Sequence, residues 1–219
     1  MRRLSIVEFL SVDGVMQGLG SPDEDRDGGF EHGGWGGPFG AALGEVLSPD
    51  IGAQTSAYLF GRRTYEKMAA FWPAQPDTDP MAASLNATPK YVATRTLRDL
   101  TWSGATVLDT DVLEAVGDLK ADGSGSVVVL GSGDLVRQLM GAGLVDELRL
   151  FLHPLLLGTG KRLFGGLPLP SSLQLVDIAS TSLGTVALTY AVGQSISSTS
   201  SSSSPGGGGS LAAADQPAR

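Results

Sequence analysis

The chain contains no cysteine among its 219 residues and only two histidines, His32 and His153. Without cysteine, disulfide bonds and thiolate metal sites are excluded. The two histidines are far apart in the sequence and lack the short spacing of a metal-ligand pair. We therefore expect no metal site.

The sequence also lacks a long apolar run and an excess of positive charge. No stretch approaches the roughly 20 apolar residues that cross a bilayer. The first residues are basic, but Glu8 and Asp13 interrupt the apolar stretch after them, which predicts a strand rather than a signal peptide. The formal net charge is −8, whereas nucleic-acid binding needs a basic face. We expect a cytoplasmic protein with no membrane or nucleic-acid partner, in which a local basic pocket for one small phosphorylated ligand is compatible with the charge.

Apolar residues become sparse near the end of the chain. Residues 195–219 read SISSTSSSSSPGGGGSLAAADQPAR, which offers too little apolar surface to offset the entropy of ordering it. We interpret this segment as a disordered tail or fusion linker. Residues 1–194 are then expected to form one domain.

Strand and helix patterns alternate through most of that domain. Strands are predicted over 4–10, 56–61, 89–93, 105–108, 127–130, 146–152, 173–180 and 185–191, and helices over 41–53, from 62 onward, over 112–121 and over 134–142. The alternation indicates an α/β fold with a mostly parallel central sheet, and the last two strands indicate an antiparallel edge.

A glycine turn joins the most apolar strand to a helix. Gly131, Ser132 and Gly133 follow Val127–Leu130, and Asp134 is expected to cap a helix whose apolar stripe starts at Leu135. Backbone N–H groups at such a turn can hold a phosphate, although glycine there is often only a packing device.

Two other predicted strands end in similar residues. Gly61, Arg62, Arg63 and Thr64 follow one strand, and Thr94–Thr96, which contains Arg95, follows another. Taken singly, these arginines are equally compatible with solvated surface side chains. If the three strands are parallel neighbours, however, the three turns line one rim, where guanidinium groups and hydroxyls bind nucleotide phosphates.

A long glycine-rich loop, residues 14–40, contains Phe30, Glu31, His32, Trp35 and Phe39. Loops of this length in a compact domain are usually functional. Two interpretations stay open: Trp35 and Phe39 cover the edge of the core, or the loop forms one wall of a substrate pocket.

These motifs, taken in order, resemble the dihydrofolate reductase superfamily. The motifs are Ser11–Gln17, Gly61–Glu66, Thr94–Thr96, Gly131–Leu135, Asp146–Leu148 with His153-Pro154, and Leu157–Gly160. They are most similar to the reductase domain of the bifunctional riboflavin-biosynthesis deaminase-reductase and its stand-alone relatives. The resemblance spans about residues 3–192.

The resemblance implies an NADPH-dependent reductase with a three-layer fold, in which helices cover both faces of a sheet of about eight strands. It implies that Gly61, Arg62, Arg63 and Thr64 contact cofactor phosphates, that Thr94, Arg95 and Thr96 lie near the 2′-phosphate, and that Gly131, Ser132, Gly133, Asp134 and Leu135 hold the pyrophosphate. Val12 and Gly14 would lie beside the nicotinamide, and Phe30, Trp35 and Phe39 beside a small substrate. It also implies a homodimer, for which the apolar runs 148–152 and 155–157 are candidate contacts.

The sequence departs from dihydrofolate reductases in one respect. Residues 35–40 contain no carboxylate where those enzymes place the acid that orients the pterin, so dihydrofolate itself is not the expected substrate. Candidate proton donors are Asp13, Glu31 and His32, although Asp13-Gly14 is also a turn dipeptide. The missing carboxylate favours an alternative from another class, a non-catalytic nucleotide-binding regulatory module.

Overall fold

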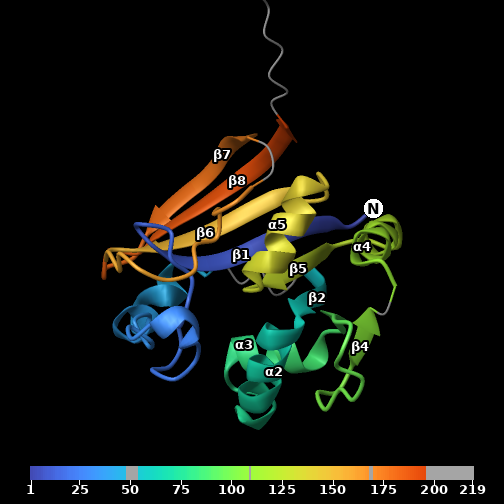
Figure 1. Ribbon diagram of the computed structural model, residues 1–219, viewed down its shortest axis with the longest axis horizontal. Helices are drawn as coiled ribbons and strands as arrows, with labels where there is room; N and C mark the ends of the chain where they lie inside the picture. The colour runs from blue at the N-terminus through green and yellow to red at the C-terminus, as the bar shows by residue number, and fades with distance from the viewer. Residues whose placement is uncertain (48–53, 109, 168–169, 196–219) are drawn as a thin grey trace, which may run out of the picture.

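An eight-stranded sheet runs through the whole protein (Figure 1). The computed structural model describes residues 1–47, 54–108, 110–167 and 170–195. The strands are β1 (Arg3–Ser11), β2 (Thr55–Gly61), β3 (Lys90–Ala93), β4 (Ala105–Leu108), β5 (Ser126–Leu130), β6 (Glu147–His153), β7 (Ser171–Ser180) and β8 (Val186–Ser195). Their order in the sheet is β4-β3-β2-β5-β1-β6-β8-β7.

Parallel pairing dominates this sheet. Every pairing from β4 across to β6 is parallel, and only the β6–β8 and β8–β7 pairings are antiparallel. The predicted mixed sheet with an antiparallel edge is therefore confirmed. One consequence decides the location of the site: β1, β2, β3 and β5 all present their carboxyl ends along the same edge.

Helices cover both faces of the sheet, as predicted. The helices are α2 (Arg62–Phe71), α3 (Pro80–Ala87), α4 (Val112–Ala121) and α5 (Gly133–Gly141), with short 3-10 segments η1 (Asp27–Gly29), η2 (Gly37–Glu45) and η3 (Trp72–Ala74). Leu135, Val136 and Leu139 of α5 pack on one face of the sheet. Tyr65 of α2 and Leu85 of α3 pack on the other.

The turn into α5 corrects one prediction. Asp134 does not cap the helix; Ser132 occupies the N-cap position, with a positive φ of 67°. Asp134 lies in the first turn, where a carboxylate favours the helix dipole, and pairs with Arg137. At the other end Gly143 has φ 66°, as expected for the residue that ends a helix.

Two helical segments differ from the sequence prediction. The helix predicted over 41–53 is a 3-10 segment, η2, that starts earlier at Gly37 and ends at Glu45, and residues 48–53 lie outside the described part of the chain. The helix α3 was not predicted, because its first residue, Pro80, belongs to a proline-rich stretch. Asp79 caps α3 by accepting hydrogen bonds from the N–H groups of Met81 and Ala82.

Two further points bear on the domain and its surroundings. The segment 195–219 lies outside the described residues, apart from Ser195, the last residue of β8. None of the helices in the described part of the chain is long and apolar enough to cross a membrane.

Lys90 at the start of β3 is fully buried and stabilises the end of α3. Its ammonium group donates hydrogen bonds to the carbonyls of Leu85, Asn86 and Thr88 at 2.7, 3.2 and 2.7 Å. The same group lies 4.8 Å from the ring centroid of Trp102, a favourable cation–π distance. Burial lowers the pKa of Lys90 because it removes water from the ammonium group. The three carbonyl acceptors compensate for this loss of hydration.

We predict that Lys90→Met destabilises the protein by about 2–4 kcal/mol, because it leaves buried carbonyl groups without a donor. Urea unfolding followed by circular dichroism measures this change. The matched control is Lys67→Met on the exposed surface of α2, for which we expect less than about 0.5 kcal/mol. Equal unfolding midpoints for the two variants would contradict the role given to Lys90.

Candidate functional site

A large cavity opens at the edge where the parallel strands end. Its volume is about 2220 Å³, well above the roughly 300–1,000 Å³ of a pocket for one small ligand. It extends from β1 across β5 and β2 to the end of β3. The cavity therefore has room for a dinucleotide and a second small molecule side by side.

The cavity brings together most of the residues that the sequence assigned to a cofactor. Its lining includes Gly61, Arg62, Arg63, Thr64, Thr94, Arg95, Gly131, Ser132, Gly133, Asp134 and Leu135. Val12, Gly14 and Thr96, from the same predicted set, are not part of the lining. The convergence of the three strand exits on one rim is thus observed, because β5, β2 and β3 are adjacent in the sheet.

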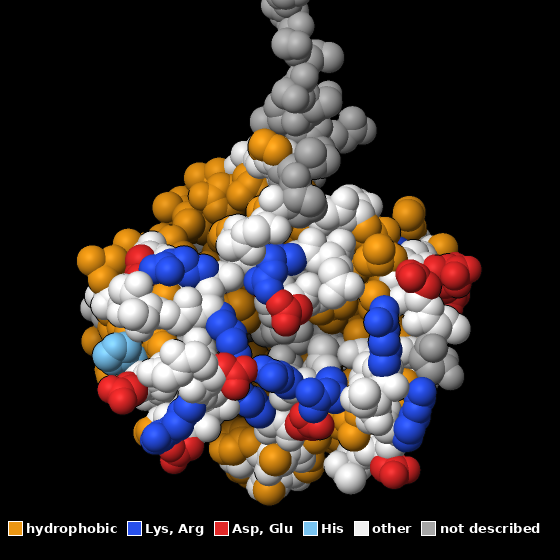
Figure 2. Space-filling view, in the orientation of Figure 1, with side chains coloured by type: hydrophobic (Ala, Val, Ile, Leu, Met, Phe, Trp, Pro, Cys, Tyr) orange, Lys and Arg blue, Asp and Glu red, His pale blue; other side chains and the backbone are white. Residues whose placement is uncertain are grey.

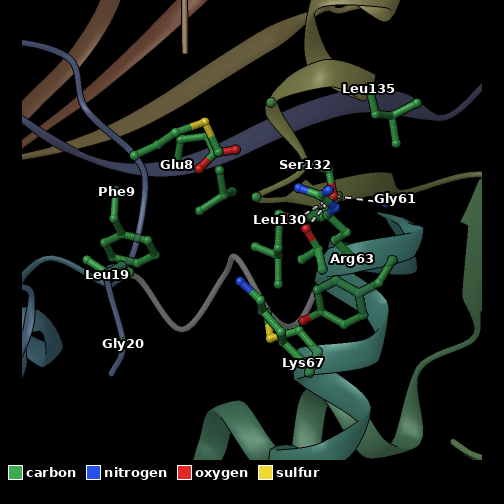
Figure 3. A pocket seen from close by; sticks show the side chains of 18 of the residues that line it. Glu8, Phe9, Leu19, Gly20, Gly61, Arg63, Lys67, Leu130, Ser132 and Leu135 are labelled. Atoms are coloured by element: carbon green, nitrogen blue, oxygen red, sulfur yellow. Dashed lines mark hydrogen bonds between the residues drawn. The ribbon is translucent and has the colours of Figure 1, made fainter. Parts of the chain in front are cut away.

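The hydroxyl of Ser132 joins two of these turns. It accepts a hydrogen bond from the Gly61 N–H at 2.9 Å and donates one to the Thr64 hydroxyl, also at 2.9 Å. Figure 3 draws the hydrogen bond between Ser132 and Gly61 as a dashed line. Ser132 is the one non-glycine residue with positive φ among the described residues, a backbone conformation that costs energy outside glycine. The hydroxyl link explains why serine stands there.

Both helix N-termini at this rim lack a side-chain cap. The N-cap residues are Gly61 for α2 and Ser132 for α5, and neither side chain caps its own helix. Free N–H groups and the helix dipole make such ends suited to an anion. Basic side chains gather in the same central region of the surface, as Figure 2 shows, and the cavity lining includes Arg62, Arg63 and Arg95.

The glycine-rich loop is held against this rim by ion pairs. Lys161 pairs with Asp25 and Asp27 at 2.7 and 2.8 Å, and Arg63 of α2 pairs with Asp27. The Lys161 and Arg63 hydrogen bonds lower the pKa of Asp27. The loop is therefore anchored to α2 through a side chain that is also a candidate phosphate ligand.

Asp13, one of the predicted proton donors, is held by hydrogen bonds from several sides. Its carboxylate accepts hydrogen bonds from the Ser11 hydroxyl, from the backbone N–H groups of Leu157 and Gly158, and from Arg162. These contacts, led by Ser11, lower the pKa of Asp13 far below its usual value. A carboxylate held ionised in this way is a poor proton donor, and Asp13 does not line the cavity.

The other residues proposed from the loop are also outside the cavity lining. Glu31 and His32 are exposed, and the His32 ring lies in a T-shaped arrangement with Phe30, with centroids 5.6 Å apart. Phe30 and Trp35 are buried in a small cluster with Val15. This burial fits the core-covering interpretation for Phe30 and Trp35, while other residues of the same loop, such as Leu19, Gly36 and Gly37, line the cavity and form part of its wall.

Phe39 and Trp35 surround a histidine that the sequence did not mark as functional. His153 is fully buried, with its ring stacked on Phe39 at 4.9 Å and in edge contact with Trp35 at 5.5 Å. Its Nδ1 lies 2.8 Å from the Thr185 hydroxyl, whereas Nε2 has no hydrogen-bond partner among the described residues. Burial lowers the pKa of His153, so this lining residue is neutral at neutral pH.

Sequence reasoning also missed Glu8, the buried acid of the cavity. Glu8 is 4% exposed, it lines the cavity, and its Oε1 has no hydrogen-bond partner. Burial raises the pKa of Glu8 to about 8. The sequence did contain a signal for this burial. Side chains alternate between the two faces of a strand, so Glu8 shares its face with the apolar residues Leu4, Ile6 and Leu10.

The comparisons with known proteins agree with this arrangement. The family model of the RibD C-terminal domain matches residues 4–188. The uncharacterized protein YyaP of Bacillus subtilis is 30% identical over 153 residues, which are 66% of this chain and 81% of that protein.

Solved structures of low identity share the fold. A putative riboflavin biosynthesis protein from Shewanella sp. PV-4 matches with a TM-score of 0.62 at 17% identity, over 88% of this chain and 99% of that one. Dihydrofolate reductase from Enterococcus faecalis, solved with NADP(H), matches with a TM-score of 0.53 at 16% identity, over 88% and 97%. The predicted dihydrofolate reductase-like fold is confirmed, and the match over most of the sequence shows that the chain belongs to the RibD C-terminal domain family.

Proposed function

We propose that this chain is an NADPH-dependent reductase that transfers a hydride to a small acceptor, of the pterin or pyrimidine class. The family is of the reductase type, and a similar fold in Enterococcus faecalis is a dihydrofolate reductase complexed with NADP(H). The observation that carries the proposal is the rim itself. Two uncapped helix N-termini and several arginines face one cavity that is large enough for two ligands.

The residues present fit a phosphorylated dinucleotide. At the turn of Gly131, Ser132 and Gly133 the N-terminus of α5 has no side-chain cap, so its backbone N–H groups are available to a diphosphate. Gly133 itself packs against Met16, since a Cβ added there would lie 2.7 Å from the Met16 sulfur. Arg62 and Arg63 at the start of α2 supply charge for the phosphates. Arg95, at the end of β3, is the residue assigned to the 2′-phosphate that distinguishes NADPH from NADH.

When bound, the cofactor supplies the hydride, and this chain supplies position and electrostatics. The sheet edge fixes one wall of the cavity, and the ion pairs of Asp27 hold the glycine-rich loop at the rim. Apolar side chains on β1 and β5, such as Val7 and Leu130, exclude water from the interior. Exclusion of water strengthens electrostatic interactions within such a site.

A non-catalytic nucleotide-binding module is the second candidate. One observation favours it: the cavity lining contains none of Asp13, Glu31 and His32, the residues proposed from sequence as proton donors. This candidate predicts cofactor binding without turnover.

The deciding experiment combines binding and turnover. We expect NADPH to bind, measured by calorimetry, and its absorbance to fall in the presence of an aromatic aldehyde, a dihydropterin or an aminopyrimidinedione. Binding with no oxidation by any of these acceptors would support the regulatory module. Failure to bind NADPH would overturn both candidates.

The assembly proposed from the resemblance is a homodimer, with the runs 148–152 and 155–157 as candidate contacts. In the second run Leu156 is 75% exposed and stays a candidate. The run 148–152 is internal, since β6 lies between β1 and β8. Strand β7 instead presents Leu175, Val176 and Ile178, which are 49, 63 and 60% exposed. Analytical ultracentrifugation measures directly whether the protein is a dimer. We also propose that the protein is cytoplasmic.

Arg95→Ala tests the choice of cofactor. We expect NADPH binding to weaken about 10–100-fold, because a charge-assisted contact to the 2′-phosphate contributes about 1.5–3 kcal/mol. NADH binding should change by less than about twofold. The control is Arg98→Ala, since Arg98 is on the same segment but outside the cavity lining. An equal effect of Arg95→Ala on both cofactors would remove Arg95 from 2′-phosphate recognition.

Ser132→Gly and Ser132→Ala together test the link between the two turns. Both variants remove the hydroxyl that bonds Gly61 and Thr64, so both should weaken NADPH binding by roughly 5–30-fold. Alanine keeps the unfavourable positive φ whereas glycine relieves it, so Ser132→Gly should be the more stable by about 1 kcal/mol. Calorimetric affinity and thermal unfolding check both points, and wild-type affinity in either variant would show that the hydroxyl is dispensable.

A further inference from the structure

Glu8 is a carboxyl group in the cavity wall that has no counter-ion in the part of the chain that the structure describes. It lies in the middle of β1, which pairs with β5 on one side and β6 on the other. In Figure 3, Glu8 and Phe9 leave the strand toward opposite sides. The side chain shares the face of Leu4, Ile6 and Leu10, which α5 covers. Such a position is expected to hold an apolar residue.

The charged groups on the segments around β1 are engaged elsewhere. Strand β5 carries none. On the other segments the pairs are Arg149 and Arg3 with Glu147, Arg137 with Asp134, Lys161 with Asp25 and Asp27, and Arg162 with Asp13, while His153 bonds Thr185. No cation of the described residues forms an ion pair with Glu8. Burial without a cation favours the neutral acid, and only the Phe9 N–H opposes this effect.

We propose that Glu8 is the neutral carboxylic acid that protonates the substrate in this cavity. The proposal rests on the proposed reductase function and deepens it. Reduction of a C=N or C=O bond adds a hydride to carbon and a proton to nitrogen or oxygen. With the hydride taken from the reduced nicotinamide, which is thereby oxidised, the O–H bond of Glu8 breaks and an N–H or O–H bond forms on the substrate. The carboxylate left behind then regains a proton from water.

The same geometry restricts the substrate. A neutral carboxylic acid offers one hydrogen-bond donor and one acceptor, and Oε1 is buried with no hydrogen-bond partner among the described residues. The matching part of a ligand is an uncharged imine, ring nitrogen or carbonyl. A carboxylate or phosphate is not matched there, because no cation accompanies Glu8; such groups belong at the arginine rim. The reducible substrate is therefore of the neutral C=N or C=O class at its reacting end.

The protonation state can be measured without any cofactor. The infrared carbonyl band of a protonated carboxylic acid should be present in the wild-type protein at about pH 6, lost at about pH 10, and absent from Glu8→Gln at both. The band should persist at neutral pH and titrate near pH 8. If raising the pH removes the band before about pH 5 is reached, as for an ordinary carboxyl group, the proposal is overturned.

Stability gives a second cofactor-free measurement. The folded protein retains the Glu8 proton from pH 4.5 up to about 8, whereas the unfolded chain releases it near 4.5. The stability of the wild type relative to Glu8→Gln should therefore fall as pH rises through this window. The exposed Glu114 on α4 supplies the matched control, since Glu114→Gln should leave the pH dependence unchanged. A pH-independent difference between wild type and Glu8→Gln would contradict the assignment.

Turnover then separates this proposal from the proposed function. With an acceptor that the wild type reduces, Glu8→Gln should lower kcat on the order of 10²–10⁴-fold at neutral pH and leave NADPH affinity within about threefold. Glu8→Asp should recover part of the lost kcat, and the wild-type kcat should fall above about pH 8. A fully active Glu8→Gln would overturn the role of Glu8 while the reductase function stands. Absence of NADPH binding in the wild type would overturn the reductase function and the role of Glu8 with it.

Discussion

The parallel pairing of β2, β5 and β1 is the constraint on which the rest of the structure depends. It places three carboxyl ends at one edge, and the chain must turn there before each following segment. Two of those turns lead directly into helices, α2 and α5, whose N-termini consequently face the same cavity. The binding rim is thus a product of strand direction.

The turns still have to be held at a fixed separation, and Ser132 does this with a single hydroxyl. Its left-handed backbone conformation would be easier for glycine, yet glycine would leave the Gly61 N–H without its acceptor. The Gly61 N–H donates its hydrogen bond to this hydroxyl. The backbone N–H groups that follow it in the first turns of α2 and α5 are the donors that a ligand could use. One strained residue therefore carries the hydroxyl contact that joins the two turns.

The scaffold was more predictable from the sequence than the site, because its signals are local. The limits of β4 and α4 match the prediction. Helix α3 escaped prediction because Pro80, which normally signals a loop, is also favoured at the first helical position after a capping Asp79. The chemistry of the site depends instead on partners distant in sequence, such as the backbone N–H groups that bind the Asp13 carboxylate. The burial of Glu8 was readable from strand alternation, but its lack of a counter-ion was not, because that depends on where every nearby cation is paired.

The protein is acidic overall, yet the proposed anionic cofactor would meet arginines at the rim of the cavity, and two of these arginines are paired with carboxylates. Arg62 pairs with Glu66, and Arg63 pairs with Asp27. These contacts hold the guanidinium groups in place near the helix N-terminus, and exposed pairs of this kind are weak enough to exchange. A phosphate that reaches Arg63 competes with Asp27, and Asp27 also holds Lys161. On the proposed function, occupation of the rim by a phosphate would therefore be coupled to the anchoring of the glycine-rich loop through Asp27.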